Sequence, residues 1–177
     1  MANHTEILMA GTGGQGLIFV ASFLAECAIA QDLNVVQTQT YGIAQRGGFI
    51  SAEAIISGEE ILFQQVTKPN VIVALHDVVD NRYDGAEAPV VYDSSLMAER
   101  SFDNWLPIPC TQTAHDMGAP RSANLVALGA AYKLYPFVDF DSIIKAANKK
   151  FAPKIAELNI EAVKKGIALA EAASHTR

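Results

Sequence analysis

Hydrophobic positions come in short runs and longer stretches through the first third of the chain. A short apolar run over 7–10 enters a glycine-rich segment, 11–16, which is typical of a buried strand that ends in a turn. Apolar residues then occupy nearly every side of 17–31, which predicts a helix packed between layers. Residues 34–40 return to a strand pattern. Strand, helix and strand within about 35 residues predict a βαβ unit with parallel strands and a right-handed crossover.

Further along, short apolar runs rich in β-branched residues predict more strands. Three of them, bounded by polar residues or proline, cover 49–56, 71–75 and 89–92. The last two are short and uniformly apolar, as buried central strands are. A fourth piece, 105–110, contains two prolines, which restrict it to an edge strand or an extended linker because proline has no N–H to donate.

The final third of the chain has the spacing of helices. Residues 124–135 carry apolar side chains three and four positions apart and end before a proline. Asp139 or Asp141 can cap a second helix, and Pro153 fits the first turn of a last one. The whole pattern predicts the α/β class: a single domain over 1–177 with a Rossmann-like, mostly parallel sheet, helices on both faces and a helical C-terminal third.

Composition limits the possible functions. Half of the 177 residues are hydrophobic, which is enough for one sizeable core. The net charge of −6 argues against a surface that binds nucleic acid or an anionic membrane, since both need clustered cations. The sequence shows no signal peptide and no apolar stretch long enough to span a bilayer, so we expect a cytoplasmic protein.

The cysteines and histidines do not form a metal site. The two cysteines, Cys27 and Cys110, are far apart, and an iron–sulfur cluster generally needs about four cysteine ligands. Cys27 lies in an apolar stretch and is expected to be a packed core thiol. The histidines lack the spacing of a metal site or a catalytic triad, and His76 is expected to be a hydrogen-bonded loop residue.

The glycine-rich segment fits the pattern G-x-G-x-x-G through Gly11, Gly13 and Gly16, with Gly14 and Gln15 between them. Such glycines let the backbone approach an anion and present N–H groups at a helix N-terminus. Tight packing of strand on helix explains them equally well. Dinucleotide binding also needs an acidic residue about 20 positions on, where this chain has only glutamine and threonine, so NAD binding is disfavoured. A Walker-type phosphate loop fails as well, because leucine follows the last glycine.

A second candidate loop, 41–48, follows the second predicted strand and contains Tyr41, Arg46, Gly47 and Gly48. It is expected near the carboxyl edge of the sheet, where open α/β sheets bind ligands. Arg46 offers a planar fork for phosphate or carboxylate. The alternative is a plain turn, with Arg46 exposed or paired with a neighbouring subunit.

A third loop, 118–124, leads into the first helix of the final third. Ser122 or Asn124 is expected to cap that helix, whereas Arg121 can face a ligand or a partner. No Ser/His/Asp set and no pair of carboxylates can be assembled from the sequence. We therefore expect no catalytic residue in this chain.

Together these segments resemble the gamma subunit of 2-oxoacid:ferredoxin oxidoreductases, over nearly the whole chain from about residue 6 to residue 166. The matching features are the G-x-G-G-Q-G turn, the Tyr41-Gly42…Arg46-Gly47-Gly48 segment, Ser51-Ala52-Glu53, the Pro109…Ala114…Gly118…Asn124…Leu128-Gly129-Ala130 run and the terminal Asn159…Ala162…Gly166 pattern. Each element alone is weak, but all of them in this order are fairly specific.

The resemblance implies a multi-subunit enzyme that oxidatively decarboxylates a 2-oxoacid to an acyl-CoA and passes electrons to ferredoxin. The 2-oxoacid is of the 2-oxoglutarate, pyruvate, ketoisovalerate or indolepyruvate type. In similar heterotetramers thiamine diphosphate and Mg are held by the alpha and beta subunits, and iron–sulfur clusters by a delta-type subunit. This chain is then expected to hold no cofactor itself and to pack on those subunits where CoA approaches. In isolation it can pair with itself as a homodimer.

Our hypothesis is that the loops 11–16 and 41–48 form one edge that faces CoA or a partner subunit, with Arg46 supplying charge. Two other readings stay open at this point. One is a stand-alone NAD(P)- or flavin-dependent Rossmann reductase, and the other is a non-enzymatic adaptor that binds a nucleotide. Tight binding of a nicotinamide, a flavin or a free nucleotide by the isolated chain would favour one of these.

Overall fold

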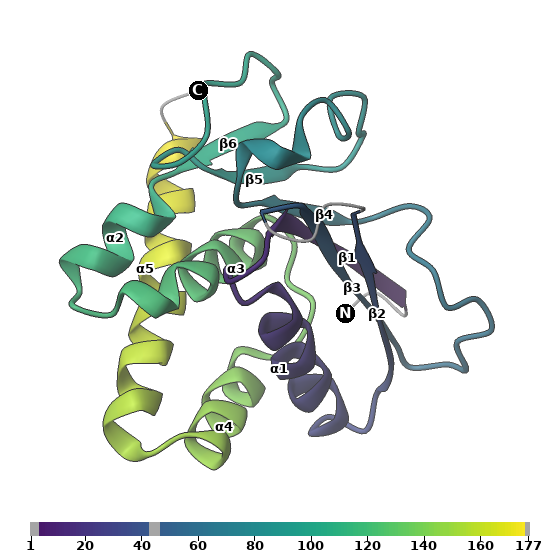
Figure 1. The fold of residues 1–177 in the computed structure, drawn as a ribbon. Coiled ribbons are helices and arrows are strands. Elements are labelled where there is room, and N and C mark those ends of the chain that lie inside the picture. Colours follow the sequence, from purple (N-terminus) through teal and green to yellow (C-terminus); the bar gives the residue numbers. More distant parts are fainter. Residues whose placement is uncertain (1–3, 43–46, 176–177) are drawn as a thin grey trace.

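The molecule is built around a sheet of six strands in the order β2-β3-β1-β4-β5-β6 (Figure 1). The computed structural model describes residues 4–42 and 47–175. The strands are β1 (His4–Thr12), β2 (Asn34–Tyr41), β3 (Phe49–Ser57), β4 (Val71–Ala74), β5 (Val90–Asp93) and β6 (Trp105–Ile108). Only β3 runs against the others, so the sheet is mostly parallel as predicted. The proline-containing strand β6 is an edge strand, which confirms the expectation for that segment.

The first three strands correct the predicted βαβ unit. Strands β1 and β2 point the same way, as predicted, and α1 (Leu17–Ile29) connects them. They are not neighbours, however, because β3 lies between them and pairs antiparallel with both. The physical reason is the short connection from β2 to β3. A parallel crossover needs about a dozen residues or more, so the chain turns back as a hairpin instead. The carboxyl ends of β1 and β2 still reach the same edge of the sheet.

The two faces of the sheet are covered differently (Figure 1). On one face the buried side chains of the sheet join those of every α-helix among the described residues in one large apolar cluster. Besides α1 these helices are α2 (Cys110–Asp116), α3 (Ala123–Leu134), α4 (Phe140–Lys150) and α5 (Pro153–Ser174). A smaller cluster on the other face is covered by the short 3-10 helix η1 (Asp77–Val79) and by loops. The prediction of helices on both faces is thus met by α-helices on one face and by a three-residue helix on the other.

The helical C-terminal third is confirmed by α3, α4 and α5. Pro153 lies in the first turn of α5, as predicted. Asp139 occupies the N-cap position of α4, although its side chain makes no cap hydrogen bond. Helix α1 packs between the sheet and α4, and its Cys27 is fully buried. Burial, with a smaller contribution from Glu26, raises the pKa of the Cys27 thiol to about 12, which confirms a packed core thiol. Within the described residues no helix is both long and apolar enough to cross a membrane.

Helices α3 and α5 cross with their backbones in contact. Glycine makes this possible on both sides of the crossing. A Cβ added to Gly129 would overlap the Val163 carbonyl, and a Cβ added to Gly166 would overlap the Val126 carbonyl. This crossing fixes the position of the first turn of α3, which borders the cavity described below.

The long loop before β4 is held by a buried carboxylate. Glu6 in β1 is only 8% exposed, and its Oε2 accepts hydrogen bonds from the backbone N–H groups of Thr67 (2.7 Å) and Lys68 (2.8 Å). Burial alone would raise the pKa of Glu6. The hydrogen bonds from Lys68, Thr67 and His4 outweigh it and hold the pKa below its ordinary value of 4.5.

We therefore expect Glu6→Gln to lower the free energy of unfolding by about 1–3 kcal/mol at pH 7, since a neutral amide oxygen accepts the two N–H bonds more weakly than a carboxylate oxygen does. Because the folded-state pKa is lowered, the contribution of the carboxylate is complete above the unfolded pKa and is lost as pH falls through the folded value. Urea unfolding at pH 7 and at pH 3 measures this effect. The difference in the free energy of unfolding between the parent and Glu6→Gln should be smaller at pH 3 than at pH 7. A difference that does not change with pH would contradict the prediction.

Candidate functional site

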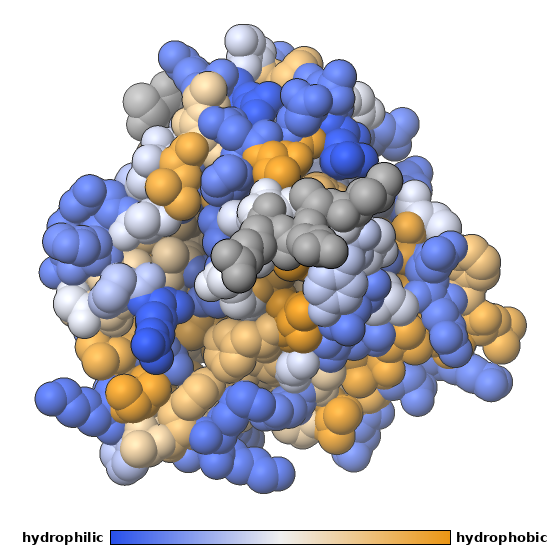
Figure 2. Space-filling model, viewed as in Figure 1, coloured by the Kyte–Doolittle hydropathy of each residue, from blue (hydrophilic) through white to orange (hydrophobic). Residues whose placement is uncertain are grey.

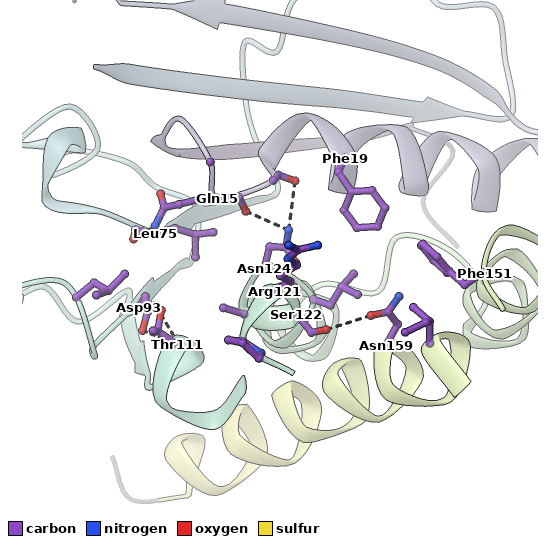
Figure 3. Close-up of a pocket in the computed structure, with 17 residues that line it drawn as sticks. Gln15, Phe19, Leu75, Asp93, Thr111, Arg121, Ser122, Asn124, Phe151 and Asn159 are labelled. Carbon is purple, nitrogen blue, oxygen red and sulfur yellow. Dashed lines mark hydrogen bonds between the residues drawn. The ribbon is translucent and has the colours of Figure 1, made fainter. Parts of the chain in front are cut away.

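A cavity of about 550 Å³ opens at the carboxyl edge of the parallel strands (Figure 3). It lies between the glycine turn that follows β1, the ends of β4 and β5, the segment 120–125 with the short helix η2 (Pro120–Ser122), and the start of α5. From β1 the chain crosses toward β2, whereas β4 continues toward β5 and β6. The gap between β1 and β4 is therefore the topological switch point of the sheet, where open α/β folds bind ligands.

Gln15 closes the bottom of this gap. Its Oε1 accepts a hydrogen bond from the Thr12 N–H (2.9 Å), and its Nε2 donates to the Leu75 carbonyl at the end of β4 (2.7 Å). The side-chain amide thus bridges two neighbouring parallel strands just beyond their carboxyl ends. It also fills the space beside Gly11, where a Cβ would overlap Oε1. The sequence left open whether the glycine turn serves ligand binding or tight packing. In the structure, Gln15 and Gly11 pack tightly against each other.

The side chain of Asn124 also holds the glycine turn in place through hydrogen bonds. Its Nδ2 donates to the carbonyls of Gln15 (3.0 Å) and Gly16 (3.3 Å), as Figure 3 shows. The prediction that Ser122 or Asn124 caps α3 is therefore wrong for both residues. Ser122 occupies the N-cap position, but its Oγ donates to Oδ1 of Asn159 (3.0 Å). The buried Ser122 hydroxyl and Asn159 amide satisfy each other, and the buried Asn124 amide donates to the turn carbonyls instead of capping α3.

The glycines of the turn divide into two groups. Gly16, at φ +74°, adopts a left-handed conformation, and a Cβ there would overlap Nδ2 of Asn124. Packing thus explains Gly11 and Gly16. Gly13 and Gly14 are exposed, and a Cβ on Gly14 would meet nothing within 4 Å although its φ is +93°. Gly14 borders the cavity, so this part of the backbone is open to a ligand or a partner.

The described ends of the loop 41–48, residues 41–42 and 47–48, lie at the same edge of the sheet as the glycine turn. Ile50 of β3 pairs with Gly11 on one side and with Tyr41 on the other. Tyr41 is 58% exposed, and Gly47 is exposed as well, while Gly48 is half-buried. A smaller hollow of about 240 Å³ lies beside Ile50 on this side of the turn. Arg46 falls outside the described residues, so its predicted role stays a prediction.

The polar end of the cavity favours an anion. Helices α1 and α3 both begin at this rim, and neither has an acidic residue in its first turn or a side-chain cap. Their N-terminal partial charges are therefore not neutralised locally. Arg121 lines the cavity and is exposed, and it makes no hydrogen bond or ion pair with any described residue. This arginine offers the planar guanidinium that recognises phosphate or carboxylate.

The one buried carboxylate at the cavity is already satisfied. Asp93, at the end of β5, is 1% exposed. It accepts hydrogen bonds from the Thr111 hydroxyl (2.5 Å), the Thr111 N–H (3.1 Å) and the Ser95 N–H (3.0 Å). Asp93 thereby fixes the start of α2 and is not free to act as a base. Its position after a strand could have been noticed in the sequence by the same rule that singled out the loop 41–48.

The opposite end of the cavity is apolar. Phe19 of α1 and Phe151 after α4 lie with ring centroids 5.9 Å apart, and Figure 3 places both at one side of the cavity. Ile155 of α5 borders them and is 47% exposed. Apolar side chains are visible in orange over α1 in Figure 2. No local pattern in the sequence singles out these three residues, because only the packing of α1, α4 and α5 brings them together.

The expectation that His76 is a hydrogen-bonded loop residue is confirmed. Nδ1 of His76 accepts a hydrogen bond from the Val78 N–H (3.0 Å) and caps η1, so the residue is a hydrogen-bonded loop histidine. In the part of the chain that the structure describes, no group of three or more His, Cys, Asp or Glu residues could hold a metal ion.

Known proteins resemble the chain over nearly its full length. The family model for pyruvate ferredoxin/flavodoxin oxidoreductase matches residues 6–169. The 2-oxoglutarate synthase subunit KorC of Archaeoglobus fulgidus is 41% identical over 135 residues, which cover 73% of this chain and 70% of that protein. The subunit of the same name from Methanocaldococcus jannaschii is 34% identical over 175 residues, or 94% of each chain.

Two solved structures share the fold. The gamma subunit of a keto/oxoacid ferredoxin oxidoreductase from Geobacter sulfurreducens PCA has a TM-score of 0.82 at 31% identity, covering 97% of this chain and 99% of that one. The 2-oxoglutarate:ferredoxin oxidoreductase of Magnetococcus marinus, with 2-oxoglutarate, coenzyme A and succinyl-CoA bound, has a TM-score of 0.82 at 28% identity. That match covers 97% of this chain and 32% of the other. The resemblance inferred from the sequence is confirmed.

Proposed function

Because the chain belongs to the pyruvate ferredoxin/flavodoxin oxidoreductase family, we propose that it is the gamma subunit of a 2-oxoacid:ferredoxin oxidoreductase. Such an enzyme oxidatively decarboxylates a 2-oxoacid to an acyl-CoA and passes the electrons to ferredoxin. Two relatives that this chain matches over nearly their whole length are named as subunits of such enzymes, which supports a scaffold role rather than a complete catalyst. Since several relatives are 2-oxoglutarate synthase subunits, 2-oxoglutarate is the favoured 2-oxoacid.

The chemistry is divided among the subunits. Both cysteines of this chain are buried, and Asp93, the one carboxylate buried at the cavity among the described residues, already accepts hydrogen bonds from Ser95 and Thr111. We infer that thiamine diphosphate, Mg and the iron–sulfur clusters belong to alpha, beta and delta-type subunits. This chain, folded as one domain around a single sheet, packs on those subunits and borders the path of CoA.

The observation that carries this role is the cavity at the switch point of the sheet. One end combines Arg121, which pairs with no described residue, with two helix N-termini, and the other end is lined by aromatic and aliphatic side chains. A ligand with anionic phosphates and a long, weakly polar arm fits this combination, and CoA has both. The glycine turn and the loop 41–48 then form the rim that faces CoA or a partner subunit, with Arg46 as a second charge. The nicotinamide alternative is not favoured, since the second half of β2 has no carboxylate where the ribose-binding one is needed, but Gln37, Thr38, Gln39 and Thr40.

Replacing Arg121 with alanine in the assembled enzyme tests the proposal. We expect the KM for CoA to rise about 10- to 100-fold, because a charge-assisted hydrogen bond to a phosphate contributes about 1.5–3 kcal/mol. The KM for the 2-oxoacid and the recovery of assembled enzyme should stay unchanged. Arg46→Ala should have the same effect, or should weaken subunit association if that residue faces a partner.

The matched control is Lys165→Ala, which removes one positive charge from an exposed position on α5 away from the cavity. Steady-state kinetics with CoA and with the 2-oxoacid, together with size-exclusion chromatography, separate the outcomes. If the KM for CoA is unchanged in Arg121→Ala, CoA does not bind in this cavity. An isolated chain that binds NADH or a flavin tightly would overturn the proposed function as a whole.

A further inference from the structure

Strand β2 ends the sheet with an unprotected edge. It has eight residues, pairs with β3 from Asn34 to Tyr41 without a bulge, and contains neither proline nor a charged residue. Natural proteins normally blunt such edges with short strands, prolines or charges. The opposite edge follows that rule, because β6 has four residues and contains Pro107. Strand β2 does not follow it (Figure 1).

One hydrogen bond defines which groups of β2 face outward. The Gly42 N–H donates to the Phe49 carbonyl, which places this pair at a hydrogen-bonded position of the β2–β3 ladder. Antiparallel strands alternate between bonded and non-bonded pairs. The even-numbered residues of β2 therefore direct their N–H and C=O groups to β3. The odd-numbered residues, Val35, Gln37, Gln39 and Tyr41, direct theirs outward, where no described residue bonds them.

We propose that this edge pairs with β2 of a second copy of the chain, in an antiparallel arrangement with the two-fold axis at Thr38. In that register Val35 lies opposite Tyr41 of the second copy, and Gln37 lies opposite Gln39. Every outward N–H and C=O group is then satisfied, since each of these pairs exchanges two backbone hydrogen bonds. The two sheets join into one continuous sheet across the axis.

The side chains of β2 complement themselves in this register. Val35 against Tyr41 is a β-branched residue against an aromatic one, and Thr38 meets Thr38 of the second copy on the axis. Cross-strand pairs of both kinds are stabilising, and like charges directly opposite would be destabilising. Here no charge meets its own copy, because β2 has none. Tyr41, which is 58% exposed in the single chain, becomes covered. This self-complementarity favours a second copy over a strand from another protein.

The inference does not depend on the CoA proposal, and a cysteine scan of the full chain tests its register. Facing residues at a non-bonded antiparallel position have Cα atoms about 4.5 Å apart, within the range that a disulfide spans. Thr38→Cys should therefore form a disulfide-linked dimer under mild oxidation. Thr40→Cys is the matched control, since it lies opposite Val36 rather than its own copy. The native Cys27 and Cys110 are buried. Equal cross-linking of both variants, or none in either, would overturn the proposed register.

Proline at Gln39 tests the hydrogen bonds themselves. Gln39→Pro removes an N–H that faces outward and leaves the ladder to β3 intact, whereas Gln39→Thr keeps the N–H as a control. Light scattering of the purified chain should give twice the single-chain mass of 19.0 kDa for the parent and for Gln39→Thr. It should give the single-chain mass for Gln39→Pro, with an unchanged circular dichroism spectrum. A monomeric parent, or a dimer that survives in Gln39→Pro, would refute self-pairing through β2. Amide protection of β2 that appears only in the assembled enzyme would assign the edge to another subunit instead.

Discussion

Replacing Gly166 with alanine is expected to lower the free energy of unfolding by about 3 kcal/mol, although only one methyl group is added. The added Cβ would overlap the backbone carbonyl of Val126, and backbone at a helix crossing cannot move aside as the end of a side chain can. The clash therefore pushes α5 away from α3 along the crossing. That displacement also carries Asn159 away from Ser122 at the rim of the cavity.

Urea unfolding followed by circular dichroism measures the loss, and Gly58→Ala is the control. A Cβ on Gly58 has no atom within 4 Å, so that variant should keep the midpoint of the parent. A reciprocal effect is expected at Gly129, whose Cβ would overlap the Val163 carbonyl on the other side of the crossing. An unchanged midpoint for Gly166→Ala would mean that the two helices are farther apart than the structure has them.

The sequence predicted most of the elements because each one depends on local pattern. The strand 71–75 was predicted from a short apolar run, and the observed β4, Val71–Ala74, differs by one residue. Strand direction is different, because a two-residue period reads the same for parallel and antiparallel strands. The antiparallel placement of β3 was missed for that reason. The missing crossover was nevertheless visible: the connection after 34–40 is too short for the helix that a parallel neighbour requires.

The sequence predicts at which edge of the sheet the candidate site lies, but not which side chains contact one another there. The glycine turn and Tyr41 lie at the same edge as expected, because the ends of strands that run in one direction meet there. The sequence predicts Gln15 as part of a turn that faces a ligand or partner, and Asn124 as one of two possible caps of α3. In the structure both side chains hold the turn closed. Their partners are 60 and 109 positions away along the chain, which a reading of local pattern cannot reach.

Replacing Gly16 with alanine is expected to disturb both the stability of the fold and the cavity. A left-handed backbone at φ +74° costs a residue with a Cβ about 1–2 kcal/mol. The same Cβ overlaps Nδ2 of Asn124, which then loses its hydrogen bonds to the Gln15 and Gly16 carbonyls. The half-buried Gln15 carbonyl then loses this donor, while the Gly16 carbonyl keeps the Val20 N–H, and the two lost hydrogen bonds cost about 1–3 kcal/mol more. We therefore expect a total loss of about 2–5 kcal/mol and a raised KM for CoA in the assembled enzyme.

Gly14→Ala separates the two causes. Its φ of +93° brings a similar backbone strain, but a Cβ there meets nothing within 4 Å. The difference between the two variants therefore isolates the contact with Asn124. In a double-mutant cycle, Asn124→Ala should cost less in the Gly16→Ala background than in the parent, because the hydrogen bonds it removes are already broken. Additive effects at these two positions would show that Asn124 does not hold the turn. The packing explanation for Gly16 would then fail, and close approach of a ligand would be the remaining reason for a glycine there.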